Sequence, residues 1–166
     1  MYAYTICFIR QNSRILLLNR QAAPWMGAWN GVGGKLKTGE DPLTGILREV
    51  TEETGIVLSQ ARYKGVVSWV SDGVPKGGMY AFSAELPDGY SFPTPKPTRE
   101  GILDWKELDW IMDPANRGVA SNLPRFLPAL LNDAVCYEHR CRFEQGRLTG
   151  FQSAPLTESA AVLERS

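Results

Sequence analysis

Three glutamates, Glu49, Glu52 and Glu53, stand at a spacing that could hold a metal ion. At about 100° per residue, positions i, i+3 and i+4 share one face of a helix. Like charges at this spacing weaken a helix by about 0.3 kcal/mol per pair, so a bound cation would compensate. Carboxylates suit Mg²⁺ or Mn²⁺, whereas zinc prefers Cys and His, which are absent nearby. The alternative is a solvated charged face.

A helix over residues 42–53 would carry these glutamates. Asp41 can cap it, Pro42 suits its first position, and Gly55 stops it. Its apolar residues follow the spacing of a face packed on a sheet, and they are Leu43, Ile46, Leu47 and Val50. Gly45 lies on the glutamate side, where the missing side chain would leave room for a ligand.

A zinc site elsewhere in the chain is the weaker metal hypothesis. Cys136, His139 and Cys141 are close in sequence, but their segment alternates like a strand. On a strand, Cys136 and His139 point to opposite faces. The chain has three cysteines, Cys7, Cys136 and Cys141, which are too few for a disulfide framework. We therefore expect reduced thiols.

The sequence around the glutamates has a defined spacing. Gly34 is followed after five residues by Glu40, and after seven more by the run REVTEETGI at residues 48–56. This pattern resembles the signature of the Nudix hydrolase family at every defined position. Residues 29–35, WNGVGGK, further resemble its MutT-type branch, which cleaves oxidised purine nucleoside triphosphates, particularly the animal members. A weaker resemblance continues through Glu100, Trp105 and residues 126–128 to about residue 151.

The resemblance implies an α/β fold, an α/β/α sandwich around a mixed β-sheet with a loop-helix-loop catalytic motif. It also implies hydrolysis of a nucleoside diphosphate linked to another group, with a divalent metal and water. Glu49, Glu52 and Glu53 would be metal ligands or the base that activates water, and spacing does not decide which acts as base. The Gly34 carbonyl would complete the coordination, and Glu100 would add a carboxylate from a distant loop. The residues that hold the motif in shape would be Glu40 and Arg48, as an ion pair, and Gly55.

Substrate contacts are expected near the glycine pair. Lys35, beside Gly33, and Arg20, at a strand end, are candidates for phosphate contacts, although each could equally be a solvated cation. Asn30 is the candidate for reading a base edge, because an amide offers both donor and acceptor groups. Its alternative role is a turn residue before Gly31.

The resemblance fails at one place. The animal enzymes that recognise oxidised purines carry a Trp and two acidic residues shortly before the segment that matches residues 126–128. Here residues 118–124 read GVASNLP, with neither. Asn122 could substitute as a base-reading amide or could cap the following helix. The base preference is therefore less defined than the pyrophosphohydrolase chemistry.

Three functions follow as hypotheses. The first is a Mg²⁺-dependent nucleoside triphosphate pyrophosphohydrolase that converts an oxidised purine substrate such as 8-oxo-dGTP to the monophosphate. The second is a Nudix enzyme acting on RNA 5′ ends, dinucleoside polyphosphates or nucleotide sugars. The third is a nucleotide-binding regulator without catalysis, against which the intact glutamate set argues.

The flanking elements would position these residues. Apolar and β-branched runs predict strands, and capping and periodicity predict a second helix that Pro128 should kink or shorten. The expected strands are 2–9, 14–20, 56–70, 79–84, 102–105, 136–143 and 147–151, and the second helix is 122–131. Strands on both sides of one strong helix favour a mixed sheet.

Length and composition bound the remaining questions. The 166 residues fit one domain, expected over residues 1–151, followed by a tail over 152–166. Eighteen Lys and Arg balance eighteen Asp and Glu, so bulk charge provides no evidence for nucleic acid binding. No apolar run approaches a membrane span, and the beginning of the chain has no signal region, so we expect a cytoplasmic protein. The expected partner is a small nucleotide, and the sequence does not indicate an oligomeric state.

Overall fold

The computed structural model describes residues 1–23 and 25–156. Within them, the strands form one sheet in the order β10-β9-β5-β6-β1-β2-β8-β7, with β3 paired to β2 and β4 paired to β1. The strands are β1 (Tyr4–Gln11), β2 (Arg14–Arg20), β3 (Trp29–Asn30), β4 (Val32–Lys35), β5 (Arg62–Ser71), β6 (Val74–Glu85), β7 (Lys96–Pro97), β8 (Gly101–Glu107), β9 (Tyr137–Glu144) and β10 (Arg147–Pro155). The helices are α1 (Pro42–Thr54), α2 (Leu108–Met112) and α3 (Leu123–Asn132).

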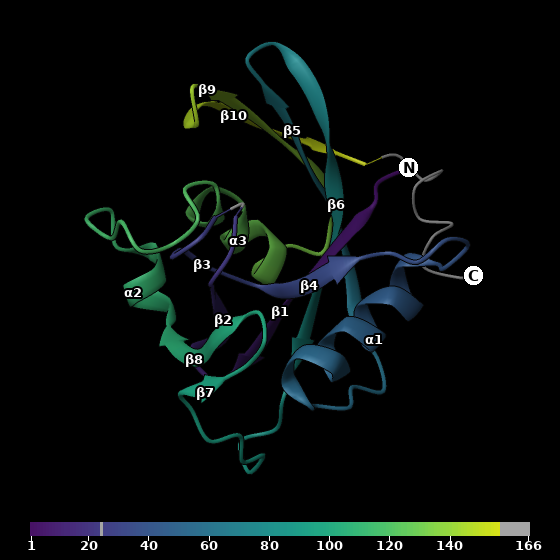
Figure 1. The fold of residues 1–166 in the computed structure, drawn as a ribbon, viewed down its shortest axis with the longest axis vertical. Helices are drawn as coiled ribbons and strands as arrows, with labels where there is room; N and C mark the ends of the chain where they lie inside the picture. The colour runs from purple at the N-terminus through teal and green to yellow at the C-terminus, as the bar shows by residue number, and fades with distance from the viewer. Residues whose placement is uncertain (24, 157–166) are drawn as a thin grey trace.

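The sheet is mixed, as predicted. β1 runs parallel to β6 and antiparallel to β2 and β4, and β5 runs parallel to β9. Helices α1 and α3 lie on different sides of β1 (Figure 1). Side chains of β1 alternate between two cores, so that Phe8 packs with Phe126 of α3 while Cys7 packs with Ile46 of α1. The expected α/β/α sandwich is confirmed.

Helix α1 begins and ends where its sequence signals lie. The Asp41 carboxylate accepts a hydrogen bond from the Thr44 N–H at 3.0 Å, and Pro42 follows at the first position. Gly55 ends the helix with a φ of 80°, a conformation that costs glycine little. These local caps fix the register of the glutamates relative to the loop before the helix.

Several expected boundaries are wrong. Residues 56–61 are a loop, and β5 begins only at Arg62, because the chain must return from the end of α1 to the sheet. Residues 29–35, where no strand was expected, contain β3 and β4, and pairing with β2 and β1 holds these strands extended. Strand β10 continues to Pro155, so residues 152–155 of the expected tail belong to the sheet, and residues 157–166 lie outside the described residues.

Helix α3 neither stops nor shortens at Pro128. The side chains of Phe126, Leu127 and Leu130, on both sides of the proline, are buried. Burial of this apolar face therefore outweighs the one backbone hydrogen bond that proline removes. No helix in residues 1–23 or 25–156 is long and apolar enough to cross a membrane.

The single histidine lies in the core beneath α3. The His139 ring is 1% exposed, stacks on Phe151 at 5.9 Å between centroids, and has its Nδ1 2.7 Å from Ser153 Oγ. Burial lowers the pKa of His139 from 6.5 to about 4. Among the described residues, Cys136, His139 and Cys141 do not form a group that could bind a metal ion.

We expect His139 to make the folded state acid-sensitive. Because its folded pKa lies below its unfolded pKa, its stabilising contribution is complete above pH 6.5 and is lost as the pH falls toward 4. The full loss is about 3 kcal/mol. Urea denaturation of wild type and His139→Phe at pH 7 and pH 5 tests this, because the difference between the two proteins cancels all other titrating groups. An unchanged difference would contradict it.

Candidate active site

Arg48 forms the centre of an ion-pair network on α1. Its Nε and Nη2 donate to the two oxygens of Glu40 at 2.7 and 2.9 Å. Its Nη1 donates to Glu49 at 2.8 Å and to Glu52 at 3.2 Å, and Nη2 also donates to the Lys35 carbonyl at 3.2 Å. The ion pair implied by the motif is therefore present. It ties α1 to the loop that precedes it and to the end of β4.

Glu40 is held as a carboxylate by these contacts. The hydrogen bonds from Arg48 and, next, from the Lys37 N–H lower the pKa of Glu40 to about 2. The Glu40 and Arg48 side chains are only 10% and 19% exposed. A bidentate pair at this burial is stronger than a surface ion pair, so it can hold the loop in one conformation.

Glu53 has a different environment from Glu49 and Glu52. It is partly buried, and its Oε2 accepts a hydrogen bond from the Gly33 N–H of β4 at 3.1 Å. Burial, together with the charges of Glu49 and Glu100, raises the pKa of Glu53 to about 8, against the opposing effects of the Gly33 N–H and Arg20. Burial is the largest of these causes, so Glu53 differs from the other two glutamates mainly in its removal from solvent.

The side-chain ends of the three glutamates do not converge in this arrangement. Arg48 draws Glu49 and Glu52 toward itself, whereas Glu53 turns to Gly33. Among the described residues, no group of acidic, His or Cys side chains is gathered so as to hold an ion. The shared helix face is as predicted. The directions of the carboxylates depend on Arg48 and on the Gly33 N–H, which helical spacing does not indicate.

The glycine pair brings β4 against both β1 and α1. A Cβ on Gly33 would collide with the Thr5 carbonyl, and one on Gly34 would lie 2.5 Å from the Glu49 carboxylate. The Gly34 carbonyl accepts a hydrogen bond from the Thr5 hydroxyl at 3.3 Å. Thr5 was not predicted from the sequence, although a buried threonine in an apolar strand was an available signal.

Gly45 has another role than the predicted one. A Cβ there would collide with the Leu36 side chain and lie 3.2 Å from the Glu40 carboxylate. The space beside α1 is therefore filled by the preceding loop and not kept for a ligand. The glycine allows the loop to pack on the helix close enough for Glu40 to meet Arg48.

Glu100 and Arg20 come to the same region from another part of the sheet. Arg20 pairs with Gly101 across β2 and β8, and the Glu100 carbonyl accepts from the Gln21 N–H at 3.0 Å. Both charges act on the pKa of Glu53, so the fold brings both near α1. Lys35 is exposed at the end of β4, where only its carbonyl contacts Arg48.

Two buried amides lie beyond the glycines. The Asn30 Oδ1 accepts from the Gly31 N–H at 2.9 Å, which is the turn role considered for it. Asn122 does not cap α3, since its side chain donates instead to Cys141 Sγ at 3.7 Å. Its Oδ1 is buried without a hydrogen-bond partner in the described part of the chain.

Backbone pairing connects these two amides. The Trp29 N–H donates to the Gly118 carbonyl at 2.8 Å, and the Ala120 N–H donates to the Trp29 carbonyl at 2.9 Å. The segment before α3 therefore lies along β3, with Asn122 two residues beyond the contact and Asn30 adjacent to it.

The family model for the NUDIX domain matches residues 1–126. The chain belongs to the Nudix family. The oxidized purine nucleoside triphosphate hydrolase of Mus musculus is 33% identical over 109 residues, which are 65% of this chain and 67% of the mouse protein. An uncharacterized Nudix hydrolase of Bacillus subtilis is 31% identical over 113 residues, 66% of this chain and 68% of that protein. The crystal structure of a MutT protein from Bacillus halodurans superposes with a TM-score of 0.72 at 24% identity, covering 92% of this chain and 97% of that one.

Family membership places the chain among hydrolases of phosphoric anhydride bonds. Nudix hydrolases generally use divalent metal ions. The residues of this Nudix protein fit such an ion by their chemistry, because three carboxylates share one face of α1 and one of them, Glu53, has a raised pKa in the absence of a cation.

Proposed function

We propose that this Nudix protein is a Mg²⁺-dependent pyrophosphohydrolase of nucleoside triphosphates, acting on an oxidised purine substrate such as 8-oxo-dGTP to release the monophosphate and pyrophosphate. The observation that carries the substrate choice is the unpartnered Oδ1 of Asn122, which is buried just after the segment that pairs with β3. The similarity to the mouse oxidized purine nucleoside triphosphate hydrolase supports the same choice.

The metal would be held by Glu49, Glu52 and Glu53, with the Gly34 carbonyl and Glu100 completing the set. A triphosphate brings negative charge to a face that is already negative, and one unit-charge repulsion at 4 Å is worth about 4 kcal/mol at an effective dielectric near 20. When bound, the cation offsets this repulsion, acidifies water and stabilises the charge of the leaving phosphate.

The chain's own groups would orient the reactants. Arg48 competes with the cation for Glu49 and Glu52, so these two carboxylates would have to turn from the guanidinium to bind it. Glu53 is held by the Gly33 N–H and would accept a proton from water or ligate the metal. Arg20, Lys35 and the backbone at Gly33 would contact the phosphates.

Base recognition would use the two amides differently. An oxidised purine with a carbonyl at C8 carries an N–H at position 7, where guanine has only an acceptor. The free acceptor Oδ1 of Asn122 is suited to that N–H, while the oxygen of Asn30 is already occupied and leaves its NH₂ group as a donor. Guanine would place its N7 acceptor against this acceptor oxygen, an arrangement with no hydrogen bond, which disfavours it.

Product analysis over a substrate panel tests the proposal. The panel contains 8-oxo-dGTP, the four dNTPs, a dinucleoside polyphosphate, ADP-ribose and triphosphorylated RNA, each with and without Mg²⁺. Preferred conversion of 8-oxo-dGTP to monophosphate and pyrophosphate would support the proposal. Faster cleavage of another substrate would keep the family chemistry and reject this substrate.

We expect Asn122→Leu to change substrate preference without weakening the fold. The ratio of kcat/KM for 8-oxo-dGTP to that for dGTP should fall by about tenfold, the effect of one lost hydrogen bond to the base. The urea midpoint should stay constant or rise, because a buried oxygen without a partner is removed. Asn30→Ala should also alter the ranking among bases. Uniform slowing of all nucleotides by either variant would contradict the base-reading role.

A further inference from the structure

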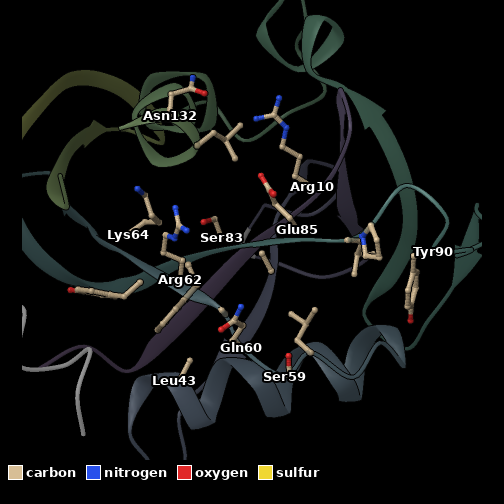
Figure 2. A pocket seen from close by; sticks show the side chains of 18 of the residues that line it. Arg10, Leu43, Ser59, Gln60, Arg62, Lys64, Ser83, Glu85, Tyr90 and Asn132 are labelled. Atoms are coloured by element: carbon tan, nitrogen blue, oxygen red, sulfur yellow. The ribbon is translucent and has the colours of Figure 1, made fainter. Parts of the chain in front are cut away.

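A cavity lies away from the glutamates of α1. It has a volume of about 850 Å³ and surrounds the beginning of β5, between the start of α1 and the end of α3 (Figure 2). None of the residues assigned above to metal or substrate binding lines it. Its volume falls in the range of about 300–1,000 Å³ that is usual for small-molecule sites.

Three basic side chains enter this cavity from β5 and β1, the two strands that flank β6. Arg62 lies opposite Ser83 in the β5–β6 pairing, and Arg10 lies beside Glu85 in the β1–β6 pairing. Figure 2 shows the side chains of Arg10, Arg62 and Lys64 on the same side of these strands as Ser83, facing the end of α3. The arrangement joins strands that are far apart in the sequence.

These cations have few partners in the protein. Lys64 is 4% exposed, and its ammonium donates to one neutral group, the backbone carbonyl of Asp133. Arg10 donates from Nε to the Asn12 carbonyl at 2.8 Å. Over residues 1–23 and 25–156, no ion pair is formed by Arg10, Arg62 or Lys64. Within these residues, Glu85 and Asp133, which also line the cavity, make none either.

A buried ammonium without a counter-charge is unfavourable unless an anion compensates it. Lys64 also caps the end of α3 through the Asp133 carbonyl, but that contact uses only one of its three donors. Guanidinium groups match the oxygens of a phosphoryl group, and the Ser83 hydroxyl adds a neutral donor between them. Tyr63, Phe82 and Tyr90 also line the cavity and make part of its wall aromatic.

We propose that Arg10, Arg62 and Lys64 form a second anion site, separate from the Nudix motif, which binds the phosphoryl group of a small phosphate-bearing ligand. The charge of Arg62 is the most informative to remove, because this side chain is exposed and forms no ion pair within the described residues. Free phosphate and a nucleoside monophosphate share the chemistry that the site would recognise.

The test is a titration of the full chain followed by backbone amide NMR shifts and calorimetry. Inorganic phosphate and AMP are added separately in EDTA, which removes divalent metal from the motif, at constant ionic strength with chloride as the matched anion. We expect saturable shifts at residues 62–64 and 83–85, and not at Gly33 and Gly34. Binding of AMP at least tenfold tighter than phosphate would identify a nucleotide as the ligand, whereas equal binding would identify free phosphate.

Matched variants make the test decisive. Arg62→Gln should raise Kd by about tenfold or more, whereas Arg147→Gln, a change of an exposed arginine outside this cavity, should leave it unchanged. Lys64→Gln should also raise Kd. Its urea midpoint should be measured as well, because Lys64 contacts the end of α3 and its loss could lower stability. The proposal is overturned if no saturation is seen, if shifts are confined to Gly33 and Gly34, or if Arg62→Gln binds as wild type does.

Discussion

Glu53→Gln is expected to reduce Mg²⁺-dependent turnover by about a thousandfold or more while the protein stays folded. The glutamine retains the size of the side chain and can still accept from the Gly33 N–H, so packing at β4 is preserved. What it loses is the negative charge that a metal ligand or a base for water requires. Steady-state kinetics on the best substrate of the panel measures the effect.

The same variant should be more stable than wild type without metal, by about 3 kcal/mol at pH 7. Burial and the charges of Glu49 and Glu100 disfavour the ionised form of Glu53, which is why its pKa is raised to about 8. A neutral side chain avoids that cost. A gain in stability together with a loss of activity is the relation expected of a functional group held in an unfavourable environment.

Glu144→Gln is the matched control, since Glu144 is exposed at a hairpin end. It should change neither turnover nor the urea midpoint. Retained Mg²⁺-dependent activity in Glu53→Gln would refute the site assignment. Absence of activity in both the wild type and this variant, with nucleotide binding retained, would instead favour a non-catalytic regulator.

Among the substitutions, Arg48→Gln is expected to cause the largest loss of stability at pH 7, about 2–3 kcal/mol. The variant would leave Glu40, Glu49 and Glu52 close together without the shared cation that now contacts all three. The ionised form of Glu40 should lose the most stabilisation, because Arg48 is the main cause of the lowered pKa of Glu40. Urea denaturation at pH 7 measures the loss.

The pH dependence separates this ion pair from a mere packing defect. Since the folded pKa of Glu40 is about 2, below its ordinary 4.5, its contribution is complete above pH 4.5 and disappears as the pH falls toward 2. The difference between wild type and Arg48→Gln should therefore shrink over that range. Arg48→Lys keeps the charge but not the paired hydrogen bonds, so it should recover only part of the loss. A difference that does not depend on pH would contradict the ion-pair account.

Local signals explain why α1 could be predicted almost completely. Asp41, Pro42 and Gly55 are chemical requirements of helix ends, and they act within a few residues. The apolar spacing then identifies the buried face, so the face that carries the glutamates follows. The family resemblance also implied an ion pair between Glu40 and Arg48, and the structure contains it.

Long-range contacts explain what could not be predicted. The rotamers of Glu49 and Glu52 depend on Arg48, and Glu53 depends on a backbone N–H of a strand some twenty residues earlier. The absence of a side chain at Gly45 indicated space for a ligand, but the Leu36 side chain fills that space. The sequence position of Asn122 is compatible with capping α3 and with contacting a base. The structure distinguishes these roles, because the Asn122 side chain makes no capping hydrogen bond.

The parallel pairing of β1 with β6 has a kinetic consequence. Tyr4 pairs with Met79, so the chain between these strands forms a closed loop that includes β4 and the whole of α1. Contacts between residues so distant in sequence form slowly, because the entropy of loop closure is lost before the contacts stabilise the structure. We therefore expect α1 to acquire its local helical turns early and the Gly33–Glu53 hydrogen bond to form late, with the central sheet.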